Sequence, residues 1–258
     1  MNVNVMPYKT ILLSLLVFLS VTVKGQNLDT VYFDIDWQKI EDGDYRFYRI
    51  ASPEDTLIKI LDYYKNGSLQ WKGRIKKDFT LINKGTFEGE ERGKCEFYFK
   101  SGTVEIMEVY QPLKNLTDIV EFYKEPITDS SSLTNLHFTV YFFKNSKVRS
   151  FGFEDLQQNR YQTWFFYSRN GRLTSKEEYG DDPNSFLNVL YNQQGNVIVS
   201  CEYKNGKRDG AYKYYWSSGL FFQTGKYEGG KKVGRWITYD TDGHPQKFKY
   251  YEKGKRVK

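Results

Sequence analysis

The chain has 258 residues, including 22 Tyr, 19 Phe and 5 Trp, and its formal net charge is +6. A disordered chain would lack so many rings, and a composition rich in rings and Gly favours strands over helices. The charge is uneven, because residues 203–258 hold 14 Lys or Arg against 5 Asp or Glu, a net of +9.

The first predicted element, residues 1–25, is a secretory signal peptide. Lys9 supplies a positive start, and the stretch from Ile11 to Val23 is apolar apart from three hydroxyl residues. Val23 and Gly25 are small enough for the −3 and −1 positions of a cleavage site, so we place the cut after Gly25. The run of about 13 residues is shorter than the roughly 20 of a spanning helix. We expect an exported chain in the periplasm, at the outer membrane or outside the cell. It would not be an integral membrane protein after signal removal, although a retained anchor is the alternative.

The next segment, residues 26–136, shows weak hairpin repeats. A Tyr stands four residues before a Gly at Tyr63 and again at Tyr98. The part near 111–136 does not follow this pattern and is predicted to be an insertion or a long loop. Cys95 takes a register position that holds Trp or Tyr elsewhere, which predicts a small buried core residue. Whether Cys95 pairs with Cys201 stays open, because spacing cannot establish the geometry of a disulfide.

Residues 137–258 carry a regular repeat of 24 residues. Several residue types keep this one step, which is a strong signal of a repeat architecture. The turn glycines are Gly171, Gly195, Gly219 and Gly243, and the tyrosines four residues before them are Tyr167, Tyr191, Tyr215 and Tyr239. A second series, eight residues after each Gly, is Tyr179, Tyr203, Tyr227 and Tyr251.

One repeat unit is predicted to be a β-hairpin. Ala211–Trp216 and Leu220–Tyr227 are short aromatic strands around the tight turn at Gly219, and residues 229–232 turn the chain into the next unit. A repeat of 24 residues that already contains two strands is too short for a βαβ unit. We therefore expect an all-β fold, an elongated antiparallel meander of hairpins with ladders of equivalent tyrosines. Trp236 and Tyr239 have opposite parity, so either both faces carry rings or a bulge intervenes.

The repeat resembles the MORN-repeat variant. The resemblance rests on Asn205-Gly206-Lys207-Arg208-Asp209-Gly210-Ala211-Tyr212 and on Gly229-Gly230-Lys231-Lys232-Val233-Gly234-Arg235-Trp236. It is good from about Tyr191 to Lys258, and proteins of this type are often labelled YwqK-family antitoxins. The resemblance implies a β-hairpin array with a binding role and no enzyme chemistry. An export signal departs from an antitoxin that neutralises a cytoplasmic toxin.

The sequence offers little catalytic chemistry. Its two histidines, His137 and His244, are predicted to have surface or structural roles, and no Cys/His cluster has metal-ligand spacing. Residues 225–231 fit part of a phosphate-binding loop, but Lys232 stands where Ser or Thr should bind magnesium. Acidic pairs such as Asp34/Asp36 look like solvated charge. We expect no catalytic residue, no metal or cofactor site, no nucleic-acid partner and no enzyme.

These features favour a non-catalytic binding or scaffold module of a bacterial cell envelope, with a protein as partner. The alternatives are an antitoxin or immunity protein that neutralises a toxin, and a module that attaches to anionic lipid or glycan. Lysines that blunt strand edges would also explain the basic end. The predicted contact surface comprises Lys213, Tyr215, Lys226, Lys231, Lys232 and Arg235.

Overall fold

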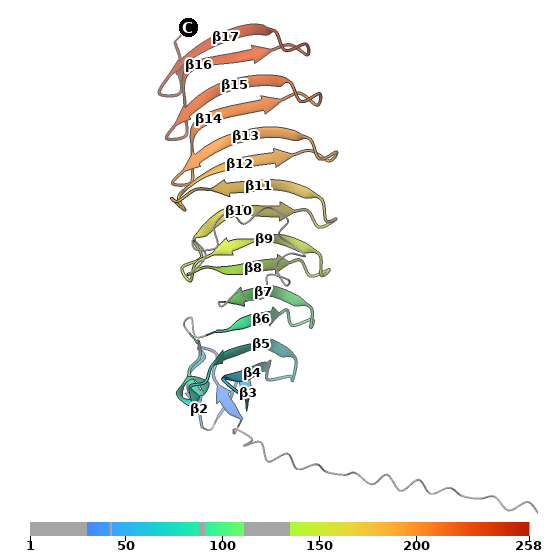
Figure 1. Cartoon of the computed structure of the whole chain (residues 1–258), viewed down its shortest axis with the longest axis vertical. Coiled ribbons are helices and arrows are strands. Elements are labelled where there is room, and N and C mark those ends of the chain that lie inside the picture. The colour runs from blue at the N-terminus through green and yellow to red at the C-terminus, as the bar shows by residue number, and fades with distance from the viewer. Residues whose placement is uncertain (1–29, 42, 88–90, 111–134, 258) are drawn as a thin grey trace, which may run out of the picture.

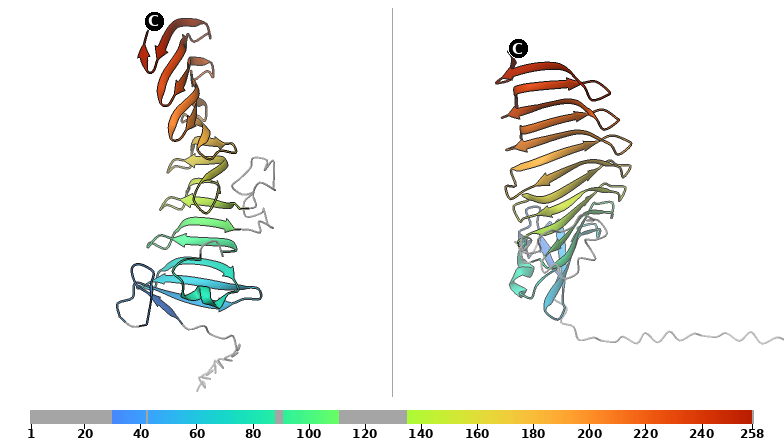
Figure 2. Two further views of the ribbon diagram at one scale, coloured as in Figure 1. Left: turned by 90° about the vertical axis from the view of Figure 1, so that its left-hand side faces the viewer. Right: turned by 45° about the horizontal axis from the view of Figure 1, so that its top comes forward.

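The fold is one long antiparallel sheet in which the strands from β3 onward follow one another in chain order, while β1 pairs with both β2 and β3 (Figure 1). The computed structural model describes residues 30–41, 43–87, 91–110 and 135–257, so the predicted signal peptide lies outside the described residues, as does most of the predicted insertion near 111–136. This architecture confirms the predicted all-β meander of hairpins. Figure 2 shows that the sheet twists along its length. Within the described ranges, no helix combines the length and apolar character that a membrane crossing requires.

The described part contains 18 strands and one 3₁₀ helix. In the N-terminal half these are β1 Val31–Phe33, β2 Lys39–Ile40, β3 Phe47–Pro53, β4 Leu57–Tyr64, β5 Leu69–Lys76, η1 Phe79–Asn83, β6 Gly93–Tyr98 and β7 Val104–Tyr110. The remainder are β8 His137–Phe142, β9 Val148–Glu154, β10 Arg160–Tyr167, β11 Leu173–Tyr179, β12 Ser185–Tyr191, β13 Val197–Lys204, β14 Lys207–Tyr215, β15 Phe221–Glu228, β16 Lys231–Tyr239, β17 Pro245–Glu252 and β18 Lys255–Arg256.

The turns that join one hairpin repeat to the next are shorter than predicted. Asn205 and Gly206 both have positive φ, as do Gly229 and Gly230, which is the backbone of a two-residue type I′ hairpin turn. The expected turn over residues 229–232 was therefore wrong, because β16 already begins at Lys231. β14 likewise begins four residues before the predicted Ala211. The strands can be longer because Gly210, with φ of 114°, lies at a register shift and absorbs a bulge.

Both faces of the sheet carry rings, so Trp236 and Tyr239, which are an odd number of residues apart, lie on opposite faces. Trp236 is buried on one face with Tyr212, Tyr227 and Tyr251 around it. We call this the ring face, and it includes Trp164, Tyr212 and Trp236. On the opposite face the ring of Phe221 lies 5.2 Å from that of Tyr215 and 6.0 Å from that of Tyr239. Tyr215 and Tyr239 of the predicted ladder thus stand in line with Phe221 between them. The register also shifts at a bulge in each of these hairpins.

The first hydrophobic core lies on the ring face of β3–β6, where β1 and the 3₁₀ helix η1 contribute Phe33, Leu81 and Ile82. Within this core the side chain of Arg49 is fully buried. Its guanidinium donates two hydrogen bonds of 2.7 Å to the carboxylate of Asp62 and further ones to the carbonyls of Ile82 and Lys84. One buried cation therefore ties β3 to β4 and to the 3₁₀ helix.

Cysteine burial agrees with the predicted core role of Cys95. Cys95 is fully buried in the first core, and its Sγ lies so close to Gly73 that a Cβ there would meet it at 2.6 Å. Cys201 is buried in a separate cluster with Tyr227 and Trp236, beside Tyr212. Both are free thiols, so the question of a disulfide between them is decided against pairing in this structure.

Candidate functional site

The predicted contact surface divides between the two faces. Strand register places Lys213 opposite Thr224 and Lys226 opposite Ala211, and it places Arg235 opposite Tyr250. Because side chains alternate along a strand, these positions all lie on the face opposite Trp236. Tyr215 and Lys231 share that face, although Tyr215 is half-buried in its ladder of rings. We call this the basic face, defined by Lys213, Tyr215, Lys226, Lys231 and Arg235.

Lys232 does not belong to the basic face. It pairs with Tyr227 on the ring face, and its ammonium lies 3.9 Å from the centroid of Trp236 and 5.4 Å from that of Tyr251. Burial lowers the pKa of Lys232, and repulsion from Lys249 and Arg208 adds to this effect. The side chain of Lys232 is thus packed on the ring face. The sequence pattern had grouped it with the lysines of the predicted contact surface, and the structure corrects that grouping.

Apolar side chains lie exposed among the cations of the basic face. Phe221, Phe248 and Tyr250 are 38%, 48% and 40% exposed, values that are high for rings. The guanidinium of Arg235 lies 4.9 Å from the centroid of Phe248, so the cation covers one ring without burying it. Lys226 and Glu228 form an exposed pair at 3.4 Å, whereas within the described residues no ion pair involves Lys213, Lys231 or Arg235. Rings with uncompensated cations between them form a surface that can bind a partner.

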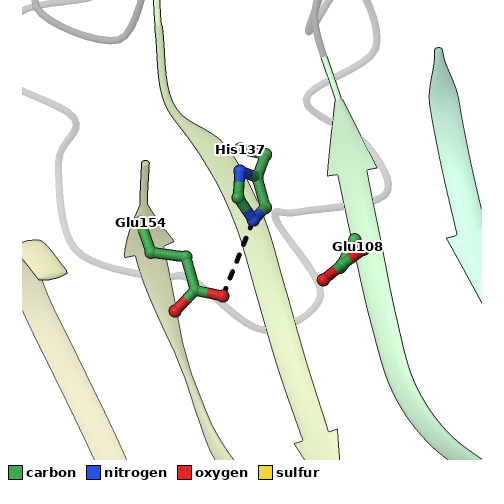
Figure 3. A group of neighbouring side chains, drawn as sticks. All are labelled: Glu108, His137 and Glu154. Carbon is green, nitrogen blue, oxygen red and sulfur yellow. Dashed lines mark ion pairs between the residues drawn. The ribbon is translucent and has the colours of Figure 1, made fainter. Parts of the chain in front are cut away.

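A second polar site lies near the middle of the sheet, on its ring face. Glu108 on β7, His137 on β8 and Glu154 on β9 point toward one another from three adjacent strands (Figure 3). One ligand atom from each lies within 4.8 Å of the other two, and His137 Nε2 is 3.6 Å from Glu154 Oε1. The side chains of His137 and Glu154 are almost fully buried.

Two tyrosines hold the carboxylates of this cluster. Tyr110 donates a hydrogen bond of 2.8 Å to Glu108, and Tyr141 donates one of 3.3 Å to Glu154. The ring of Tyr110 also stacks on the imidazole of His137, with centroids 4.8 Å apart. Burial and the nearby carboxylates raise the pKa of Tyr110, and they raise that of Tyr141 to about 12. Both hydroxyls therefore remain protonated donors at neutral pH.

The surroundings of Glu108 disfavour the charged form of its carboxyl group. Burial raises the pKa of Glu108, and the charges of Glu154 and Glu91 act in the same direction, while the hydrogen bond from Tyr110 and the charge on His137 oppose them. Two polar atoms nearby lack a hydrogen-bond partner among the described residues, Glu91 Oε2 and Thr139 Oγ1, and both atoms are buried. Buried polar groups are normally paired, so these atoms need an explanation.

Sequence reasoning did not find this cluster. Glu108 and Glu154 are far apart in the chain, and His137 was expected to have only a surface or structural role. The structural signal is the register, which pairs His137 with Glu154 and Glu108 with Thr139. A second trio, Asp240, Asp242 and His244, is also close enough to hold an ion, but it lies at an exposed turn. Asp240 already accepts the backbone N–H groups of Asp242 and His244, as the turn requires.

No family model matches this chain, and a search of curated proteins finds no match.

Proposed function

We propose that the chain is a non-catalytic, exported binding or scaffold protein of the bacterial cell envelope, and that its basic face binds a protein with an acidic surface. The observation that carries this proposal is the arrangement on the basic face, where exposed rings alternate with cations. Phe248 and Tyr250 lie beside Arg235 in adjacent strands, and Lys213 follows two strands away. The assignment to the envelope rests on the predicted signal peptide at residues 1–25.

The shape of the surface favours a protein partner. A sheet presents its side chains in flat rows, and aromatic side chains with Arg are the groups enriched at protein interfaces. Tyr250 offers contact area at a small cost in conformational entropy. Lys213, Lys231 and Arg235 would supply charge complementarity, which raises the association rate and selects an acidic partner. A shallow hollow lined by Lys231, Val233 and Tyr250 lies where the face reaches the last strands, and it gives the surface relief.

The test is site-specific photocrosslinking in the native host. A photoreactive phenylalanine analogue replaces Phe248 on the basic face, and a matched control replaces Lys247, which is exposed and lies on the ring face opposite Thr238. We expect a specific crosslinked protein from position 248 and none from position 247. Mass spectrometry of the crosslinked band, after cell fractionation, identifies the partner and its compartment together.

Charge reversal provides the second arm of this test. Lys213→Glu with Arg235→Glu should weaken the crosslink at position 248 at least tenfold, whereas Lys247→Glu should leave it unchanged. Equal crosslinking from both faces, or a crosslink insensitive to charge reversal, would contradict the proposal. A toxin as the crosslinked partner would favour the antitoxin or immunity alternative. Salt-sensitive sedimentation with anionic vesicles and no protein crosslink would favour attachment to anionic lipid instead.

A further inference from the structure

We propose that Glu108, His137 and Glu154 bind one divalent transition-metal ion, with Zn²⁺ as the preferred ion. The spacing of the ligand atoms supports this, because two ligands about 2.1 Å from a tetrahedral Zn²⁺ lie about 3.4 Å apart. His137 Nε2 and Glu154 Oε1 are separated by 3.6 Å, and an atom of Glu108 completes a trio within 4.8 Å (Figure 3). Small side-chain rotations bring such a trio onto one ion.

The charge of the cluster is the first independent reason. Glu108 and Glu154 bring carboxylate oxygens within 4.8 Å of each other beside the largely buried imidazole of His137, and Glu91 has a buried oxygen without a partner among the described residues. Arg160 is the register partner of Glu154 on the neighbouring strand, but its guanidinium forms an ion pair of 2.9 Å with Glu177. Buried charges are expensive unless they are paired or coordinate a metal. A bound dication would compensate the negative charge of the carboxylates, which the single imidazole of His137 does not balance.

The hydroxyl of Thr139 is the second reason. Thr139 is fully buried, and its Oγ1 has no hydrogen-bond partner among the described residues. It stands two residues after His137 on the same strand, so it projects onto the same face, directly between Glu108 on one side and Gly152 on the other. Gly152 has no side chain there, and the indole ring of Trp164 lies directly over it and closes that side of the cluster. A water molecule on the bound ion would give Thr139 its missing partner.

The surroundings of the trio resemble the outer shell of a metal site. Ligands of bound metals are themselves held by hydrogen bonds that fix their orientation. Tyr110 holds Glu108, Tyr141 holds Glu154, and the ring of Tyr110 fixes the plane of His137 by stacking. These contacts limit the rotation of all three ligand groups before an ion binds.

The ligand set selects among metals. One imidazole with two carboxylates suits Zn²⁺ and its first-row neighbours, whereas Ca²⁺ and Mg²⁺ prefer oxygen ligands alone. Bound Zn²⁺ would connect β7, β8 and β9, because each of these strands supplies one ligand. The ion would thereby clamp the sheet between its first core and the C-terminal repeats. This inference does not depend on the proposed function of the basic face.

The experiment measures Zn²⁺ binding to the tag-free full chain after removal of metals with a chelator. Isothermal titration and native mass spectrometry should show one Zn²⁺ per chain, and Co²⁺ at the site should give visible d–d absorption. His137→Gln should abolish the bound stoichiometry, and Glu108→Gln should weaken binding at least a hundredfold. Tyr110→Phe keeps the ring but loses the hydroxyl, so we expect binding about tenfold weaker. His244→Gln, in the exposed second trio, is the matched control and should bind as the wild type does.

The variants keep the proposal testable even if one of them misfolds. Tyr110→Phe and Glu108→Gln are close in shape to the native side chains, and hydrogen exchange of β7–β9 reports whether the strands form. Zn²⁺ should increase the protection of these strands in the wild-type chain and not in Glu108→Gln. The proposal is overturned if the wild-type chain binds no stoichiometric Zn²⁺. It is also overturned if His137→Gln and Glu108→Gln keep their affinity, or if His244→Gln loses it.

Discussion

Replacement of the buried Arg49 by Met should destabilise the N-terminal core severely. Met keeps much of the aliphatic length of Arg but removes its charge and every hydrogen-bond donor. In the native chain these donors satisfy the carboxylate of Asp62 and the carbonyls of Ile82 and Lys84. The guanidinium also lies 4.9 Å from the ring of Phe33 and 4.4 Å from that of Phe87.

The expected loss follows from the groups that Met leaves unpaired. Breaking a buried ion pair by removing one partner costs about 3–5 kcal/mol. An orphaned carbonyl costs about 1–3 kcal/mol, with the lower figure for Lys84, whose contact is only partly buried. We therefore expect Arg49→Met to lower the free energy of unfolding by about 5 kcal/mol. In the double variant with Asp62→Leu the buried carboxylate is gone, so the loss should fall to about 2 kcal/mol.

Urea denaturation combined with hydrogen-exchange mass spectrometry measures this effect and its location. Exchange should accelerate in β3–β5 and stay unchanged in β14–β17, because in a repeat array each unit contacts only its neighbours. Arg74→Met is the matched control on β5, since Arg74 forms an exposed pair with Glu54 and its loss should cost under about 1 kcal/mol. A loss below about 1 kcal/mol for Arg49→Met, or a double variant no more stable than the single one, would refute the reasoning.

Three further predictions concern other parts of the sheet. Gly225→Ala should cost about 1–3 kcal/mol, because a Cβ there would lie 2.2 Å from the Trp236 ring. The control Gly180→Ala, which meets nothing within 4 Å, should be neutral or slightly stabilising in the same melt. Burial acts to raise the pKa of Glu96, but hydrogen bonds from Lys72, Tyr98 and Lys94 outweigh it and hold that pKa at about 2, below its ordinary 4.5. Glu96 therefore stabilises the fold by about 2 kcal/mol above about pH 4.5, a figure reduced for solvent screening because Lys72 and Lys94 are about half exposed. This contribution is lost as the pH falls toward 2. Acid titration of unfolding should show this loss in the wild type and not in Glu96→Gln. Finally, burial raises the pKa of Cys95 to about 12 and that of Cys201 to about 11, so neither thiol should react with Ellman's reagent at pH 8 until urea unfolds the chain. Rapid labelling of a thiol in the folded chain would contradict this.

Five of the six residues that the sequence predicts as a contact surface lie on one face of the sheet, and Lys232 lies on the other. The basic character of residues 203–258 and the strand alternation place Lys213, Lys226 and Arg235 correctly on one face. The sequence pattern grouped Lys232 with them because residues 229–232 were expected to form a turn. β16 instead begins at Lys231, so strand alternation places Lys232 on the face of Trp236. Nothing in the spacing of Glu108, His137 and Glu154 indicates that they meet.

The sequence by itself determined the repeating hairpin, the positions of its turn glycines and the meander that joins the hairpins, whereas the two-residue length of the turn at Gly229 and Gly230 came from the structure. Turn glycines such as Gly206 and Gly219, together with alternating rings, act over a few residues, so their effect is visible in the chain order. Only the tertiary structure decided the buried pair of Arg49 with Asp62, which side chains lie on the basic face and which on the ring face, and the polar cluster around His137. These depend on which residue of one strand lies opposite which residue of the next. That register is set jointly by every bulge and loop between the strands, and no local pattern records it.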